Sequence, residues 1–179
     1  RASLPMENLL HDILVSNLTA FLLIFMRFGL ALMIMPGIGD SFVSPQIRLL
    51  FALALSFVMT PFLTPQLPAL PSNTFSLATL LFSEAFIGIF IGTVMRIIMN
   101  ALDTAGLLIS TQAGFSNAML FNPITATQGS MIGALYSSLG VVLLLMTDMH
   151  HHMLAAVATS YQMFPANGHL PDFSSISEA

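Results

Sequence analysis

Apolar residues fill four long runs along the chain, and turn-forming residues separate these runs. The first run covers about residues 9–35, which is longer than the roughly 20 residues that cross a bilayer as one helix. It ends at Pro36–Asp40, a segment dense in proline and glycine. The second run covers residues 45–60, with Ser44 as a candidate N-cap and Pro45 as a candidate first helical residue. These runs predict two helices, and the second barely reaches the length of a membrane span.

The other two runs are longer, at about residues 74–110 and 125–164. Each would measure roughly 55–60 Å as a straight helix, nearly twice the thickness of a bilayer's hydrocarbon core. Such helices must bend, break or continue beyond the bilayer into protein surroundings. Glycines are the expected weak points; they are Gly88, Gly92, Gly106 and Gly140.

The composition agrees with a membrane protein. Hydrophobic residues make up 56% of the chain and charged residues only 7%, against about a quarter in soluble domains. So few charges cannot supply a solvated surface, and four arginines without a lysine form no basic patch for a nucleic-acid partner. We therefore expect a single all-α domain, a polytopic membrane-associated protein with about four long helices in hairpins, two of them over-long and kinked.

Small and polar residues form a stripe along the third helix, because they recur at intervals of four, one above the other on a helix. The stripe comprises Glu84, Gly88, Gly92, Arg96 and Asn100. The fourth helix carries Gly129, Gly133 and Ser137 at the same interval. Glycines spaced in this way allow two backbones to approach closely, although glycine is also common in membrane helices generally. We expect these stripes to face each other or a neighbouring subunit.

Charged residues inside apolar runs need an explanation, since a lone charge in hydrocarbon costs about 2.5–3.5 kcal/mol or more. The four are Arg27, Glu84, Arg96 and Asp103. They should pair with one another, or face a partner or a wet cavity. The preferred pair is Arg27 with Glu84, as a structural link between helices, and the alternative is a proton or ion relay.

The segment between the third and fourth helices, residues 112–124, combines helix breakers with apolar side chains. Irregular backbone at membrane depth must be buried in protein or line a water-filled cavity. An apolar loop in such a place can close a pore, or it can simply pack beneath other helices, and composition does not decide between these. The candidate residues of a pore plug are Gly114, Phe115, Met119, Leu120, Phe121, Asn122 and Pro123.

Catalytic motifs do not emerge from the sequence. The chain has no lysine for a phosphate-binding loop and no nucleophile elbow, and it lacks cysteine. The three adjacent histidines, His150–His152, point about 100° apart on a helix, so one helix cannot aim all three at one ion. We expect neither an enzyme nor a bound cofactor or metal.

Several short motifs, taken in order, resemble the FliR family over roughly residues 9–168. They are Arg27-Phe28-Gly29, Pro36-Gly37-Ile38-Gly39, Ser44-Pro45-Gln46-Ile47-Arg48-Leu49, Thr60-Pro61, Glu84-Ala-Phe-Ile-Gly88, Gly92, Gln112-Ala-Gly-Phe115, Phe121-Asn122-Pro123, Gln128, His150-His151 and Ser160-Tyr161-Gln162-Met163-Phe164-Pro165. The resemblance implies a subunit of the bacterial type III protein-export gate, a helical assembly with FliP and FliQ subunits, joined by FlhB. Such a gate passes unfolded flagellar or virulence proteins through the inner membrane, and the Phe-Asn-Pro loop and the His-His pair favour the flagellar basal body.

The resemblance also implies that the loop matching residues 114–123 lies in the gate lumen and acts as a plug. Members of the family usually continue with two further helices, so the sequence is expected to be a fragment of a longer chain. The alternative function is a small-solute secondary transporter or channel subunit. A transporter should show inverted repeats and a polar pocket, and the sequence shows neither.

Overall fold

The computed structural model describes residues 4–68, 73–114 and 131–166, and their side chains from residue 14 onward. All regular structure within these ranges is helical, which confirms the predicted all-α class. The elements, in chain order, are α1 (Leu4–Ile34), α2 (Pro45–Leu63), the short 3₁₀ helix η1 (Thr64–Gln66), α3 (Thr74–Gln112), α5 (Met131–Met146) and α6 (Met149–Met163).

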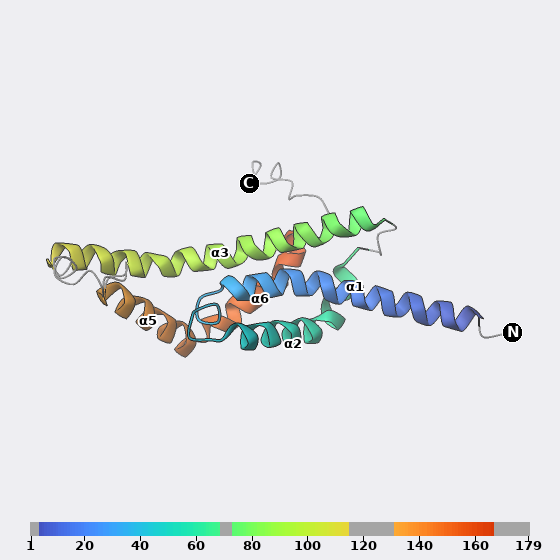
Figure 1. The fold of residues 1–179 in the computed structure, drawn as a ribbon, viewed down its shortest axis with the longest axis horizontal. Helices are drawn as coiled ribbons and strands as arrows, with labels where there is room; N and C mark the ends of the chain where they lie inside the picture. The colour runs from blue at the N-terminus through green and yellow to red at the C-terminus, as the bar shows by residue number, and fades with distance from the viewer. Residues whose placement is uncertain (1–3, 69–72, 115–130, 167–179) are drawn as a thin grey trace.

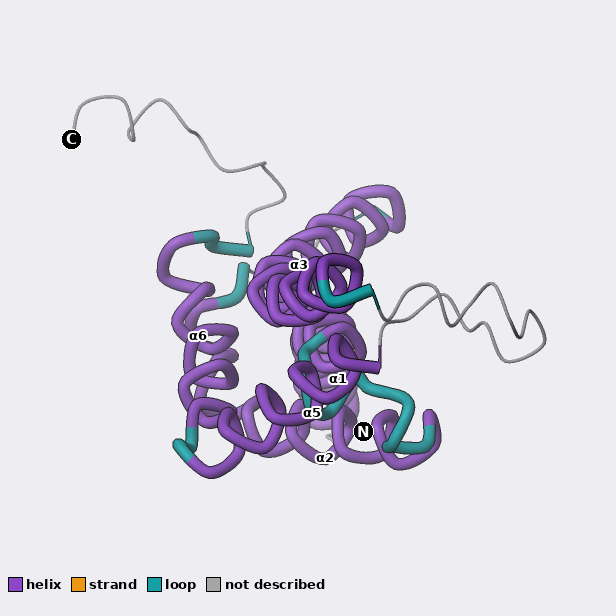
Figure 2. The backbone as a smooth tube through the Cα atoms, turned by 90° about the vertical axis from the view of Figure 1, so that its left-hand side faces the viewer, coloured by secondary structure: helices purple, strands orange, loops and turns teal. Residues whose placement is uncertain are grey.

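Helices α1 and α3 lie side by side along the long axis of the molecule and run in the same direction (Figure 1). Helix α2 returns along α1 and makes this parallel arrangement possible. The far end of α3 extends beyond α1 and packs against α5. Viewed along the long axis, α6 stands beside the row formed by α3, α1 and α2 (Figure 2).

Within the described ranges, three helices are long and apolar enough to cross a membrane. These spans are Leu14–Ile34, Pro45–Gln66 and Thr74–Gln112, with lengths of 21, 22 and 39 residues. Helices α5 and α6 together form a fourth candidate that is bent by 75°. The described part of the chain is thus a polytopic helical membrane protein, as its hydrophobic pattern predicts.

The second helix begins where the sequence predicts it and ends later. Ser44 is the N-cap, and its side-chain oxygen accepts a hydrogen bond from the Ile47 backbone N–H at 3.4 Å. The predicted end at Thr60 is wrong, because α2 continues through Pro61 to Leu63. Pro61 lies within the last turn, so little helix remains after it to be disturbed by its ring and missing N–H.

The predicted single helix over residues 125–164 is divided in the structure, and the break lies at Asp148 rather than at a glycine. Asp148 has φ 56° and ψ 17°, a left-handed conformation that a right-handed helix cannot contain. Aspartate adopts it more readily than most residues with a side chain. Gly140 lies inside the unbroken α5, and α3 runs through all three of its predicted weak points.

The glycines of α3 serve close packing instead of bending. A Cβ on Gly92 would lie 2.9 Å from the Ala31 carbonyl oxygen in α1, too close for any real side chain. A Cβ on Gly88 would lie still closer to the Arg27 carbonyl oxygen of α1, whereas Gly106 is the α3 glycine that meets Gly133 of α5. We expected the stripe at Gly88 and Gly92 to face the stripe of the fourth helix or a neighbouring subunit, and the structure corrects this, because both glycines face α1. Gly129 lies outside the described residues.

Candidate functional site

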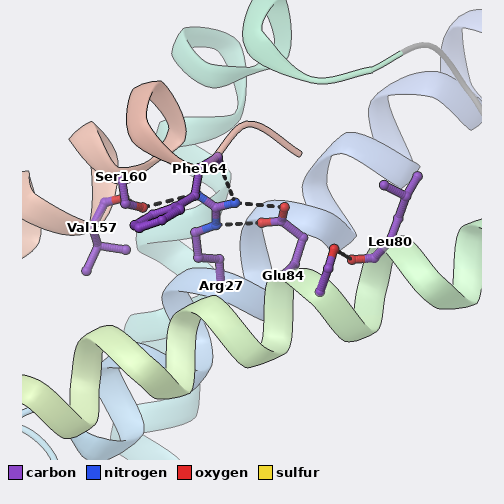
Figure 3. A network of polar contacts seen from close by, with 7 residues as sticks. Arg27, Leu80, Glu84, Val157, Ser160 and Phe164 are labelled. Atoms are coloured by element: carbon purple, nitrogen blue, oxygen red, sulfur yellow. Dashed lines mark hydrogen bonds and ion pairs between the residues drawn. The ribbon is translucent and has the colours of Figure 1, made fainter. Parts of the chain in front are cut away.

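A charged pair occupies the centre of the helix packing. Arg27 of α1 and Glu84 of α3 are both 0% exposed. The guanidinium Nε donates to Glu84 Oε2 at 2.7 Å, and Nη2 donates to Oε1 at 2.9 Å (Figure 3). Two parallel bonds of this kind are the strongest form of an arginine–carboxylate pair. The structure therefore brings together the two residues that the sequence analysis preferred as partners.

The same guanidinium also binds the C-terminal part of α6. Arg27 Nη1 donates to the Ser160 side-chain oxygen at 3.0 Å, and Nη2 donates to the Phe164 carbonyl oxygen at 2.9 Å (Figure 3). The guanidinium carbon lies 3.8 Å from the centre of the Tyr161 ring, a distance at which a cation is attracted to the ring face. One arginine thus connects α1, α3 and α6.

Gly88 allows this network to form. It follows Glu84 by one helical turn, and the absence of a side chain there lets α1 approach α3 at the backbone of Arg27. The glycine and the glutamate of the sequence stripe therefore act together, one admitting the helix and the other receiving its charge. Apolar side chains enclose the network, including Ile24, Phe28 and Val157 of the main core cluster.

A second ion pair fixes the turn between α1 and α2. Arg96 Nη1 of α3 lies 2.5 Å from Asp40 Oδ1, and the two side chains are 36% and 15% exposed. The other oxygen of Asp40 accepts the Gly37 backbone N–H at 2.8 Å. Arg48 donates further bonds to the carbonyl oxygens of Gly39 and Val43, so the turn is held from both sides.

Asp103, the fourth charge considered in the sequence analysis, is exposed on α3. It makes no ion pair within the described residues. The partner of Arg96 is Asp40, which the sequence analysis did not consider among the charges that pair. The signal for Asp40 was its position in the Pro-Gly turn, where an aspartate side chain often binds a nearby backbone N–H.

The predicted plug begins where the described part of α3 ends. Ala113 N–H donates to the Ile109 carbonyl at 2.9 Å, and Gly114 then adopts φ +78°. A left-handed glycine is the common device that ends a helix. The remaining plug candidates lie outside the described residues, and their role stays a prediction: Phe115, Met119, Leu120, Phe121, Asn122 and Pro123.

Sequence reasoning missed the α6 side of the network, namely Ser160, Tyr161 and the Phe164 carbonyl. Polar Ser160 and Tyr161 near the end of an apolar run were the available signal. Nothing in their spacing pointed to Arg27, because the contact depends on the bend at Asp148 that returns α6 to the other helices.

Apolar spans, glycine-mediated helix contacts and buried charges define the class as a polytopic helical membrane protein. Residues 18–178 match the sequence model of the bacterial export proteins, family 1. The chain belongs to this family, which confirms the resemblance drawn from its motifs.

Relatives in several bacteria agree with this assignment. The chain is 37% identical over 149 residues to the flagellar biosynthetic protein FliR of Caulobacter vibrioides, covering 83% of this chain and 59% of that protein. It is 29% identical over 154 residues to FliR of Bacillus subtilis, covering 86% and 59%. It is also 25% identical over 167 residues to the Yop proteins translocation protein T of Yersinia pestis, covering 93% and 64%. The chain thus spans about three-fifths of the length of these relatives.

Proposed function

We propose that the protein is a subunit of a bacterial type III protein-export gate and forms part of the channel for unfolded flagellar proteins. Its family and the names of its relatives, flagellar biosynthetic proteins and a Yop translocation protein, support this function. The proposed location is the inner membrane, within the flagellar basal body. The proposed partners are FliP and FliQ subunits and FlhB.

The observation that carries the proposal is the mismatch between helix length and lipid thickness. Helix α3 has 39 residues, or about 58 Å, and a bilayer covers about 30 Å of it. Large apolar side chains remain exposed along its whole length, from Phe75 to Ile109. Outside lipid, so much exposed apolar surface requires partner subunits.

The ion-pair network has a supporting role in this proposal. It holds α1, α3 and α6 in one fixed arrangement, so that their outer faces form a stable wall. The proposed plug, residues 114–123, would act from this fixed wall. Apolar side chains such as Phe115, Met119 and Phe121 can then close the lumen to water and ions.

An assembly experiment tests the proposed function. Leu108 is 58% exposed on α3, and Leu108→Asn should reduce co-purification of the intact protein with FliP and FliQ by roughly tenfold, with a matching loss of flagellar protein secretion. Leu108→Met, which keeps an apolar side chain at the same position, is the control and should leave both unchanged. A protein that purifies alone, with secretion unaffected by Leu108→Asn, would contradict the proposal.

A measurement of ion conductance tests the proposed plug. Replacing Phe115, Met119 and Phe121 together by Ala should raise the ion conductance of membranes that contain the assembled gate. The shorter side chains would leave a wider opening, which water and ions can enter. Gate assembly is measured in parallel. An assembled gate with unchanged conductance would remove the sealing role of this loop while leaving the export function in place.

A further inference from the structure

A group of side chains of metal-binding type lies at the bend between α5 and α6, at the opposite end of α6 from the Arg27 network. Asp148, His150 and His151 each offer one ligand atom, and these atoms all lie within 4.8 Å of one another. His151 Nδ1 lies 3.5 Å from Asp148 Oδ1. The helix contacts and ion pairs described above do not involve these three side chains.

The backbone at the bend creates this grouping. The backbone of Asp148 is left-handed, and the chain changes direction there from α5 to α6. The Asp148 carboxylate therefore lies at the bend itself. His151 lies one turn into α6, and its N–H donates to the Asp148 carbonyl at 3.0 Å. The rings of His150 and His151 lie with their centres 4.1 Å apart at an angle of 38°.

Helix geometry rules out three adjacent histidines as a ligand set, but it permits two histidines with a carboxylate from the preceding bend. His152 is outside the group, and its Nδ1 lies 3.4 Å from the Asp148 backbone carbonyl. His150 adds an independent sign of a missing ligand. Its Nδ1 is buried and has no hydrogen-bond partner within the described part of the chain, a state that usually requires an unseen partner.

We propose that Asp148, His150 and His151 bind one divalent transition-metal ion of the zinc, nickel or copper class. Imidazole nitrogen and carboxylate oxygen suit these ions, which bind them at about 2.0–2.2 Å. Such ligands stand roughly 3.3–3.5 Å apart in a tetrahedral site, so the group needs only a modest side-chain contraction. Water completes the coordination, because two of the three residues are exposed.

The ion would join the bend residue to the first turn of α6 and so hold the direction of α6. This effect is separate from export, and it acts at the opposite end of α6 from Ser160. The proposal rests on the bend geometry and on the unpartnered His150 Nδ1, and it stands whether or not the proposed gate function is correct.

Zinc titration of the intact protein, purified as its membrane complex and stripped with a chelator, tests the proposal. Calorimetry should detect one Zn²⁺ ion bound per chain. Asp148→Asn and His151→Ala should each weaken its affinity about tenfold or more. Asparagine also tolerates the left-handed conformation, so Asp148→Asn preserves the bend while removing the carboxylate charge. His152→Ala is the matched control and should change the affinity less than about twofold.

A second measurement guards against misfolded variants. Zn²⁺ should raise the thermal unfolding midpoint of the wild type and of His152→Ala but not that of Asp148→Asn, while all three unfold alike without metal. The absorption spectrum of bound Co²⁺ should change with His150→Ala and not with His152→Ala. Equal Zn²⁺ binding by wild type and Asp148→Asn, or equal losses in His151→Ala and His152→Ala, would overturn the site as adventitious binding to exposed histidines.

Discussion

The two arginine–carboxylate pairs of α3 lie in different surroundings, about one-third of the helix apart. Arg27 and Glu84 are fully buried among three helices, and the guanidinium has further partners in Ser160 and Phe164. Arg96 and Asp40 lie at a turn, partly exposed, with the guanidinium holding a single carboxylate oxygen. The same two chemical groups therefore have different physical roles.

The difference follows from solvation. Removing one member of a buried pair leaves an uncompensated charge in a low-dielectric interior, which costs about 3–5 kcal/mol. A partly exposed pair loses little, because water replaces the lost partner and the median contribution is about 0–1 kcal/mol. The buried pair should thus decide whether the three helices assemble, and the exposed pair should only adjust the turn.

The largest expected effect comes from Glu84→Ala. This change leaves Arg27 buried without its carboxylate and should destabilise the protein by about 3–5 kcal/mol, a large share of a typical folding free energy. The measurement is the thermal unfolding midpoint and yield of the purified membrane complex.

Two double variants sharpen this result. Arg27→Met with Glu84→Met should recover much of the loss, because no buried charge remains. The reversed pair, Arg27→Glu with Glu84→Arg, should recover less, since a glutamate cannot donate to Ser160 or to the Phe164 carbonyl. If Glu84→Ala unfolds within about 1 kcal/mol of the wild type, the buried pair does not organise the helices.

The next effect concerns the glycine that admits α1 to the buried pair. Gly88→Ala places a methyl group against the Arg27 backbone and should cost about 1–3 kcal/mol through forced separation of α1 and α3. Gly29→Ala in α1 is the control, because the nearest atoms to its new Cβ would belong to the flexible Phe25 ring, at an ordinary 3.4 Å. It should be neutral or slightly stabilising, since alanine favours a helix. Equal unfolding midpoints for both variants would show that helix approach at Gly88 is not tight.

The fold was largely predictable where an apolar run is bounded by helix-capping or helix-breaking residues. Ser44-Pro45 specified the start of α2, and the apolar length of residues 74–110 specified α3 as one helix. The bend at Asp148 was not predictable, because aspartate inside an apolar run is compatible with a continuous helix. Its left-handed backbone depends on where α6 finds tertiary contacts, which local sequence does not encode.

The site was predictable to the extent that burial of a charge demands an opposite charge. Arg27 and Glu84 are both embedded in apolar runs, so each had few possible partners. The neighbour of Gly88 and Gly92 was not predictable, because a small-residue stripe specifies close approach but not the helix that approaches. The contacts from α6 could not be predicted either, because they depend on the three-dimensional path of the chain.

The smallest effect separates the two functions of Asp40. Arg96→Met removes only the partly exposed ion pair and should cost about 0.5 kcal/mol, a loss that disappears at high salt because screening has already weakened the pair. Asp40→Ala also removes the acceptor of the Gly37 N–H and should cost about 1 kcal/mol more at any salt concentration. Asp40→Asn retains an oxygen for Gly37 and should therefore resemble Arg96→Met. Unfolding midpoints of the three variants at low and high salt measure these terms. If Arg96→Met proves as damaging as Glu84→Ala, then exposure does not distinguish the two pairs, and the turn must be as important to assembly as the buried network.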